Sequence, residues 1–209
     1  MAVLGLAPPA LAQQTLACTK GERGLAEAAL RNAKLLTLHA ATAVGDTPAF
    51  ARWFGKYDPP AGEEVRGTLK AVHRAIRSGA VEITCLRAGA RCEDGIFAFV
   101  YDDRPHEVYL CPGFFRLPSM AGLRPQAAAG INGTREGTLI HEISHFRTVG
   151  ATRDHCYTRP DCTEMAQAAP ARARRNADSY QYFSEDVSLA RRRGAGQGKA
   201  PPAAEEDRP

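Results

Sequence analysis

Several sequence features that define common protein classes are absent from this chain. No apolar run reaches the roughly 18 residues that a membrane-spanning helix needs, so no membrane partner is expected. There is no internal repeat, no glycine-rich phosphate loop and no Gly-x-Ser-x-Gly sequence of the serine hydrolases. No Cys-x-x-Cys pair is present, which argues against a cysteine-rich zinc site.

Charge also gives little sign of a nucleic-acid partner. The net charge is only +4, and much of the positive excess lies in Arg172, Arg174, Arg175 and the run 191–193. A nucleic-acid surface would need a basic face with interleaved aromatic residues. Here the last arginine run lies in a Gly/Ala/Pro-rich segment, which is typical of a solvated tail.

What remains is the composition of a globular protein with one domain and two tails. The chain has 209 residues, of which 44% are hydrophobic and 24% charged. Residues 1–14 are apolar and contain a small-x-small cleavage signal at 10–12, so they are expected to be the remnant of a signal peptide. We expect one domain over residues 15–189 and a disordered tail over 190–209.

The feature that points most directly to chemistry is the run His141-Glu142-x-x-His145. On a helix, two histidines four residues apart project from one face and can bind the same metal ion. The flanking apolar residues recur at helical spacing, and Thr134 is a suitable N-cap. The Glu142 carboxylate can reach a water on the ion and act as a general base. A surface helix with two histidines is the alternative that this context disfavours.

A catalytic zinc site of this kind needs a third protein ligand and one open position. Gly150 is predicted to end the helix and turn the chain back. Asp154 follows His145 by nine residues, close enough to return to the metal. Tyr157 comes three residues later and can donate its hydroxyl to a developing oxyanion. His155 is a weaker candidate for a residue that supports a ligand.

At this point the sequence resembles the aspzincin metalloendopeptidases, which comprise the deuterolysins and the peptidyl-lysine metalloendopeptidases. The resemblance rests on the His-Glu-x-x-His run and the following turn with its Asp and Tyr. It covers roughly residues 16–188 and is nearest to the peptidyl-lysine branch in the segments 51–55, 97–101, 108–111 and 176–185. It implies an α+β zincin-like fold with a helical N-terminal half, a small antiparallel sheet and the metal helix.

The resemblance also implies the roles of individual residues. His141, His145 and Asp154 would hold one Zn²⁺ per chain. In the lysine-specific members two acids receive the substrate lysine, and the matching positions here are Asp178 and Gln181. Because an amide replaces one acid, a cation would be attracted more weakly. Asp178 has a second interpretation, as the N-cap of the last helix. Ala151 stands where the family usually has glycine.

The even cysteine count predicts three disulfides formed in an oxidising compartment, which favours a secreted or periplasmic protein. Spacing alone allows 15 pairings of six cysteines. The resemblance implies Cys18–Cys85 and Cys92–Cys111, which leaves Cys156–Cys162 as a short loop beside Asp154 and Tyr157.

Periodicity and turn residues place the remaining elements. A helix is expected over residues 20–44, with Leu25 on the buried stripe. A short helix capped by Thr47 is expected to run through Trp53 and Phe54, which are expected to be core anchors. Another helix is expected over 62–78 after a turn at 58–60. A strand is expected near 81–86 and an antiparallel hairpin over 96–101 and 107–111. Short helices are expected over 164–169 and 180–189.

These observations predict a secreted zinc endopeptidase that acts on polypeptides. The resemblance implies a preference for lysine or another basic residue after the cut. A monomer is expected. Two alternatives stay open: a non-catalytic secreted zinc-binding module, in which Cys156 or His155 would close the fourth metal position, and a toxin-like protease with one narrow target.

Overall fold

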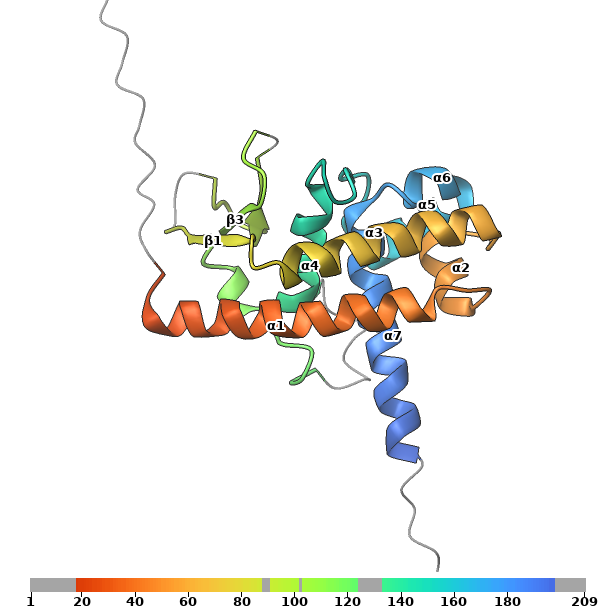
Figure 1. Ribbon diagram of the computed structural model, residues 1–209, viewed down its shortest axis with the longest axis horizontal. Helices are drawn as coiled ribbons and strands as arrows, with labels where there is room; N and C mark the ends of the chain where they lie inside the picture. The colour runs from red at the N-terminus through yellow and green to blue at the C-terminus, as the bar shows by residue number, and fades with distance from the viewer. Residues whose placement is uncertain (1–17, 88–90, 102, 124–132, 198–209) are drawn as a thin grey trace, which may run out of the picture.

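The computed structural model describes residues 18–87, 91–101, 103–123 and 133–197 (Figure 1). The expected signal-peptide remnant at 1–14 and the end of the expected tail, 198–209, lie outside the described residues. The described elements are seven α-helices, one short 3-10 helix and three strands. None of the described helices combines the length and apolar character that a bilayer crossing requires.

Two long helices form one side of the molecule. Helix α1 (Lys20–Ala43) begins with a capping box between Thr19 and Glu22, and helix α3 (Pro59–Arg77) lies alongside it (Figure 1). The predicted turn at 58–60 is wrong, because Asp58 caps α3 and Pro59 occupies its first turn. The prediction for Leu25 is also wrong: its side chain is exposed, while the neighbouring Ala26 is buried.

Helix α2 (Pro48–Phe54) supplies the aromatic part of the core. Thr47 caps it. Trp53 and Phe54 are buried as predicted, and Phe50 is buried as well. The Trp53 and Phe54 rings lie about 5 Å from Tyr182 and Tyr180 of the last helix. The aromatic contacts therefore join the N-terminal helices to the helix that reaches the metal-binding residues.

The sheet is mixed rather than antiparallel. Strands β2 (Ala98–Phe99) and β3 (Glu107–Leu110) pair antiparallel, as the predicted hairpin requires, but β1 (Glu82–Cys85) pairs with β3 in parallel. The order is β1-β3-β2 because the hairpin folds back and inserts β3 between the other two strands. A 3-10 turn (Phe114–Arg116) follows. This order leaves β2 at an edge of the sheet.

The second half of the chain places the metal helix at the centre of the molecule. Helix α4 (Arg135–His145) is packed against α1, α3 and α7 (Ala177–Gln197), with α5 (Arg159–Ala168) and α6 (Pro170–Ala173) further out. Nine residues of α4, from Glu136 to Ser144, are buried. Thr134 caps α4 as predicted, but the helix ends at His145 rather than at Gly150, since Phe146 already has an extended ψ of 130°.

The last helix is longer than expected. Helix α7 begins at Ala177 and continues to Gln197, past residue 190 where the tail was predicted, and its end projects from the body (Figure 1). Leu189 is buried, and the guanidinium of Arg192 donates to the carbonyls of Ala121 and Leu123 at 3.5 and 3.2 Å. The contacts of Arg192 hold α7 against the body of the protein beyond the buried Leu189.

Three disulfides link the cysteines. Cys18–Cys85 and Cys92–Cys111 are the pairs that the resemblance implied, and Cys156–Cys162 is the pair that was left over. The first ties the start of α1 to the end of β1 across 67 residues. The second joins the hairpin region to the end of β3. The third closes a loop of six residues directly after Asp154.

Candidate metal centre and substrate cleft

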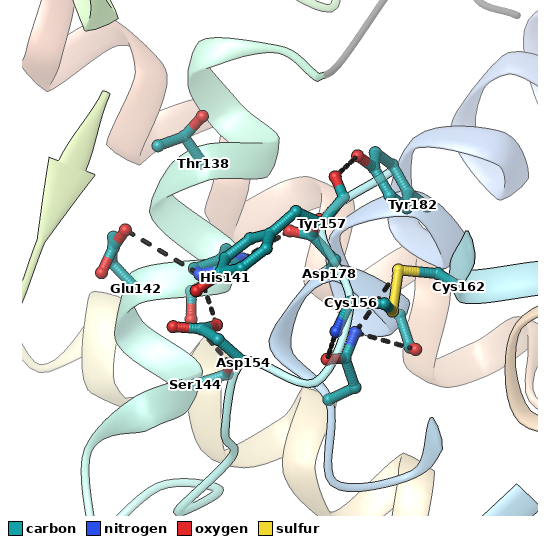
Figure 2. Close-up of polar contacts among 12 residues, drawn as sticks. Thr138, His141, Glu142, Ser144, Asp154, Cys156, Tyr157, Cys162, Asp178 and Tyr182 are labelled. Atoms are coloured by element: carbon teal, nitrogen blue, oxygen red, sulfur yellow. Dashed lines mark hydrogen bonds and ion pairs between the residues drawn. A yellow bond between two sulfur atoms is a disulfide. The ribbon is translucent and has the colours of Figure 1, made fainter. Parts of the chain in front are cut away.

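Three potential ligand atoms converge on one point. His141 Nε2 lies 3.1 Å from Asp154 Oδ1 (Figure 2). His145 Nε2 lies 3.2 Å from the same oxygen. The two Nε2 atoms are 3.1 Å apart. Ligand atoms that surround zinc tetrahedrally at about 2.0–2.1 Å are about 3.3 Å from one another. The spacing of the three atoms therefore fits a single ion of this size.

The other nitrogen of each imidazole shows which way the lone pairs point. His141 Nδ1 lies 2.6 Å from Asp178 Oδ1, and His145 Nδ1 lies 3.0 Å from the carbonyl oxygen of Thr152. We assign the ring proton to Nδ1 in both, because a carbonyl and a carboxylate only accept. In the neutral rings both Nε2 lone pairs would face each other and an anionic oxygen, so the cluster favours a cation among these atoms, which is either a metal ion or, without one, a proton.

The pKa shifts of His141 and Asp154 also indicate that this cluster stabilises a positive charge. Burial by itself lowers the pKa of His141, but its hydrogen bonds to Asp154 and Asp178 outweigh burial and raise it well above the usual value. Burial raises the pKa of Asp154, yet its bonds to His141 and His145 leave it far below its usual range. Asp154 therefore carries a negative charge at any ordinary pH, as a metal ligand must.

The loop that returns Asp154 to the helix is fixed by backbone and hydroxyl bonds. Ser144 Oγ and Thr152 Oγ1 lie 2.6 Å apart, and the Thr152 amide donates to the Ser144 carbonyl at 3.2 Å. Ala151 adopts a φ of 48°, in the left-handed region. The usual glycine of the family at this position is thus explained by the turn, and alanine occupies the same conformation at a small cost in strain.

Glu142 lies beside the three ligand atoms without joining them. Its side chain is buried, and its carboxylate is 4.0 Å from His141 Nε2 (Figure 2). Burial raises its pKa, while the neighbouring imidazoles oppose that rise. A carboxylate with a raised pKa can accept a proton and release it again near neutral pH.

Tyr157 lies in the same connection between α4 and α5 as Asp154, and it lines the same site. Its side chain is 62% exposed, far more than the other site residues, yet it lines the cleft beside the metal ligands. Burial of the hydroxyl and the carboxylate of Asp154 both raise the pKa of Tyr157. The hydroxyl therefore stays protonated near neutral pH and is available as a hydrogen-bond donor.

Asp178 has a contact that sequence reasoning missed. It was expected to bind a substrate cation or to cap the last helix, but its carboxylate bonds to the ring of His141, and α7 already begins at Ala177 (Figure 2). The helices approach closely enough because Gly137 faces α7, where an added Cβ would collide with Glu185 and Gln181. A metal-binding histidine needs such an acceptor, but its position in the sequence gives no sign of which acid serves.

The remaining candidate site residues differ in whether their side chains lie at the cleft. Gln181 is buried and lines the same cleft as Asp178. His155 donates its backbone N–H to Asn176 Oδ1 at 2.8 Å, and no bond of its ring to a metal-site residue occurs in the described chain. Cys156 is in a disulfide, so its sulfur cannot close a fourth metal position. Among the described residues, His141, His145 and Asp154 form the only such cluster of potential ligands.

A cleft of about 670 Å³ opens over these residues. One wall is formed by residues 95–100, which include the edge strand β2. The other wall carries the three potential ligands, Glu142, Tyr157, Asp178 and Gln181. An extended edge strand facing a metal-binding cluster across an open cleft is suited to holding another extended chain.

Sequence comparison identifies the family to which this arrangement belongs. The model of the aspzincins, described as lysine-specific metallo-endopeptidases, matches residues 39–185, which is more than half of the chain. This chain is an aspzincin. The fold class predicted from the sequence is confirmed, apart from the mixed pairing of the sheet.

Individual aspzincin relatives come from bacteria and fungi. An extracellular protease of Aeromonas hydrophila is 31% identical over 140 residues, 66% of this chain. A peptidyl-Lys metalloendopeptidase of Grifola frondosa is 34% identical over 141 residues, 67% of this chain. In each case the match spans 36% of the relative's length. The solved zinc peptidase from Grifola frondosa superposes with a TM-score of 0.68 at 28% identity, covering 82% of this chain and 98% of that one.

Proposed function

We propose that this aspzincin is a zinc-dependent endopeptidase that hydrolyses peptide bonds in extracellular or periplasmic polypeptides. The observation that carries the proposal is the convergence of His141, His145 and Asp154 beside an open cleft that also contains Glu142. Two imidazoles and one carboxylate are a donor set typical of catalytic zinc. When bound, zinc would lower the pKa of a coordinated water and polarise the scissile carbonyl.

The protein's own residues move the proton and hold the substrate. Glu142 takes a proton from the attacking water and delivers it to the nitrogen of the leaving amine. Tyr157 donates its hydroxyl to the oxygen on which negative charge develops. The free edge of β2 pairs with the backbone of the substrate and aligns it across the cleft.

A basic residue after the cleaved bond is the finer part of the proposal. Support comes from the names of the relatives and from Asp178 and Gln181, which both line the cleft. A lysine ammonium there would meet one carboxylate and one amide oxygen. The Asp178 carboxylate is shared with His141 at 2.6 Å, so we expect a moderate preference for basic residues rather than a strict requirement.

The same protein is proposed to be exported and monomeric. Three disulfides suit an oxidising compartment, and one relative carries the name of an extracellular protease. The open cleft and the unavailability of Cys156 speak against the alternative of a closed, purely structural zinc site. A toxin-like protease with one narrow target would use the same chemistry and differs only in its substrate range.

A digest of mixed proteins tests the proposal. The purified chain is incubated with the mixture alone, with a chelator, and with a chelator followed by excess zinc, and the new N-termini are sequenced. We expect cleavage that the chelator abolishes and zinc restores, with basic residues enriched at the new N-termini. The variant Glu142→Gln serves as the control for a contaminating protease. Cleavage that is insensitive to the chelator, or unchanged in that variant, would contradict the proposal.

A further inference from the structure

Tyr157 is the site residue whose side chain is held least by packing against its neighbours. Its ring is 62% exposed, so packing alone does not fix its position. Its backbone carbonyl, however, accepts a hydrogen bond of 2.8 Å from the hydroxyl of Tyr182 (Figure 2). The position of the Tyr157 backbone therefore depends on a residue 25 positions away in the chain.

Tyr182 is well suited to holding a backbone group in place. It is fully buried in α7, and its ring lies 5.0 Å from the Trp53 ring, centroid to centroid. The guanidinium carbon of Arg159 lies 4.5 Å from the centre of the Tyr182 ring. The enclosed ring restricts where the hydroxyl can lie, and the Tyr157 carbonyl is within hydrogen-bond distance of it.

The guanidinium of Arg159 is itself fixed by two acids. It donates to Glu185 at 2.7 Å and to Asp186 at 2.8 Å, and Glu185 also accepts from the backbone and hydroxyl of Thr134 at 2.9 Å each. Thr134 is the N-cap of α4, the helix that carries Glu142. One buried network thus joins the start of the metal helix to the ring that holds Tyr157.

The neighbours of Tyr157 on either side are fixed by other means. The amides of His155 and Cys156 donate to Asn176 Oδ1 at 2.8 and 3.1 Å, and Cys156 is in a disulfide. Thr158 caps α5 through its hydroxyl. Among the described contacts, the Tyr182 hydroxyl is the one that binds the Tyr157 backbone itself.

We propose that Tyr182 is a positioning residue for the peptidase reaction, because its hydroxyl fixes the Tyr157 carbonyl and so aims the Tyr157 ring into the cleft. This inference rests on the proposed function. A hydroxyl stabilises a developing oxyanion only within normal hydrogen-bond distance, and a displacement of about 1 Å is enough to lose much of the effect. Tyr182 touches neither substrate nor metal. Its hydroxyl also interacts with the carboxylate of Asp178, so the test has to distinguish an effect through Tyr157 from one through Asp178 and His141.

The chain offers a closely matched control in Tyr180. It is also fully buried in α7, its ring lies 5.1 Å from Phe54, and its hydroxyl donates to a backbone carbonyl, that of Arg174, at 2.6 Å. The variants Tyr182→Phe and Tyr180→Phe each remove one buried hydroxyl of the same kind. Only the first removes a hydrogen bond to the backbone of Tyr157 itself.

Steady-state kinetics with zinc-loaded protein tests the inference. We expect Tyr182→Phe to lower kcat about tenfold with KM and zinc content unchanged, and Tyr180→Phe to change kcat less than about twofold. In a Tyr157→Phe background, Tyr182→Phe should cost nothing more, because the group it positions is already gone. Three results would each overturn the inference: an equal loss of kcat from Tyr182→Phe in both backgrounds, an equal effect of Tyr182→Phe and Tyr180→Phe, or a loss explained by missing zinc.

A spectroscopic readout separates this inference from the proposed function. The carbonyl carbon shift of Tyr157, measured by NMR on labelled protein without metal, should move in Tyr182→Phe and stay in place in Tyr180→Phe. If Tyr182→Phe does not fold, slow exchange of the Tyr182 hydroxyl proton in the unchanged protein tests the same bond, and rapid exchange would refute it. Absence of any peptidase activity in the unchanged protein would defeat the proposed function and leave the NMR result standing.

Discussion

The carboxylate of Asp178 lies 2.6 Å from Nδ1 of His141, on the side of the imidazole opposite the Nε2 that faces Asp154. Both side chains are buried, and they come from different helices, α7 and α4. A carboxylate in this position fixes the tautomer and orientation of the ring and makes Nε2 a better ligand. Asp178 is therefore placed to support the proposed metal centre, and it also lines the cleft.

Replacing Asp178 should weaken metal binding. We expect Asp178→Asn to lower zinc affinity about 10–100-fold, because a neutral amide orients the ring without increasing its basicity. Competition with a chromophoric chelator measures the affinity. The exposed Asp161→Asn variant is the control for loss of one negative charge. An unchanged zinc affinity in Asp178→Asn would show that the bond to His141 has no influence on the metal.

Replacing Glu142 should separate catalysis from metal binding. We expect Glu142→Gln to keep its zinc, since Glu142 is not among the converging ligand atoms, and to lower turnover by about 10²–10⁴. Metal content and kcat are measured on the same preparation. Peptidase activity near that of the unchanged protein would end the assignment of Glu142 as general base.

Zinc should stabilise the fold through Asp154. A ligand at about a thousand times its dissociation constant adds about 4 kcal/mol to the free energy of unfolding, so a chelator should lower the melting temperature of the zinc-loaded protein. Asp154→Ala removes one of three proposed ligands, so this variant should bind zinc weakly. Its melting temperature should change little when zinc or the chelator is added. Full zinc occupancy in Asp154→Ala, by elemental analysis, would exclude Asp154 as a ligand.

The replacement of a family acid by Gln181 makes a prediction about specificity. We expect Gln181→Glu to raise the preference for lysine over neutral residues after the cut about tenfold, because a second carboxylate would then face the cleft beside Asp178. The ratio of kcat/KM for two peptides that differ only at this residue measures the preference. A ratio that does not change would place the lysine side chain elsewhere in the cleft.

Glu185 should make the stability of the fold depend on pH. Burial raises its pKa to about 7 from the usual 4.5, although Arg159 and Thr134 oppose the rise. The folded state therefore binds this proton more tightly than the unfolded state. The resulting stabilisation is complete below about pH 4.5 and is lost as the pH rises to 7. Its upper limit is about 3 kcal/mol, from about 1.4 kcal/mol per pKa unit.

The variant Glu185→Gln isolates this contribution, because Arg159 retains its bond to Asp186 at 2.8 Å. Urea unfolding of both proteins at several pH values gives the free energy of unfolding. Between pH 4.5 and 7 the unchanged protein should lose stability relative to Glu185→Gln. Parallel curves for the two proteins over this interval would show that the carboxyl of Glu185 ionises as it does in the unfolded chain.

Local pattern was sufficient for much of the fold. The N-caps Thr47 and Thr134 and the buried aromatic pair of α2 were predicted correctly. Errors arose where a local signal had two meanings. Asp58 followed by two prolines suits a turn or the first turn of a helix, and the structure uses the second. The sheet was predicted as antiparallel because only the hairpin is local, whereas β1 pairs with a strand 25 residues later.

The sequence by itself determined the metal helix, since two histidines four residues apart on a helix share a face whatever the rest of the chain does. Only the tertiary structure decided which groups hold that face in place. Asp178 reaches His141 across 37 residues, and Tyr182 reaches Tyr157 across 25, because α7 packs against α4 and the loop beyond it. Helical spacing is set by backbone geometry, whereas contacts of this range are set by how complete side-chain surfaces pack together.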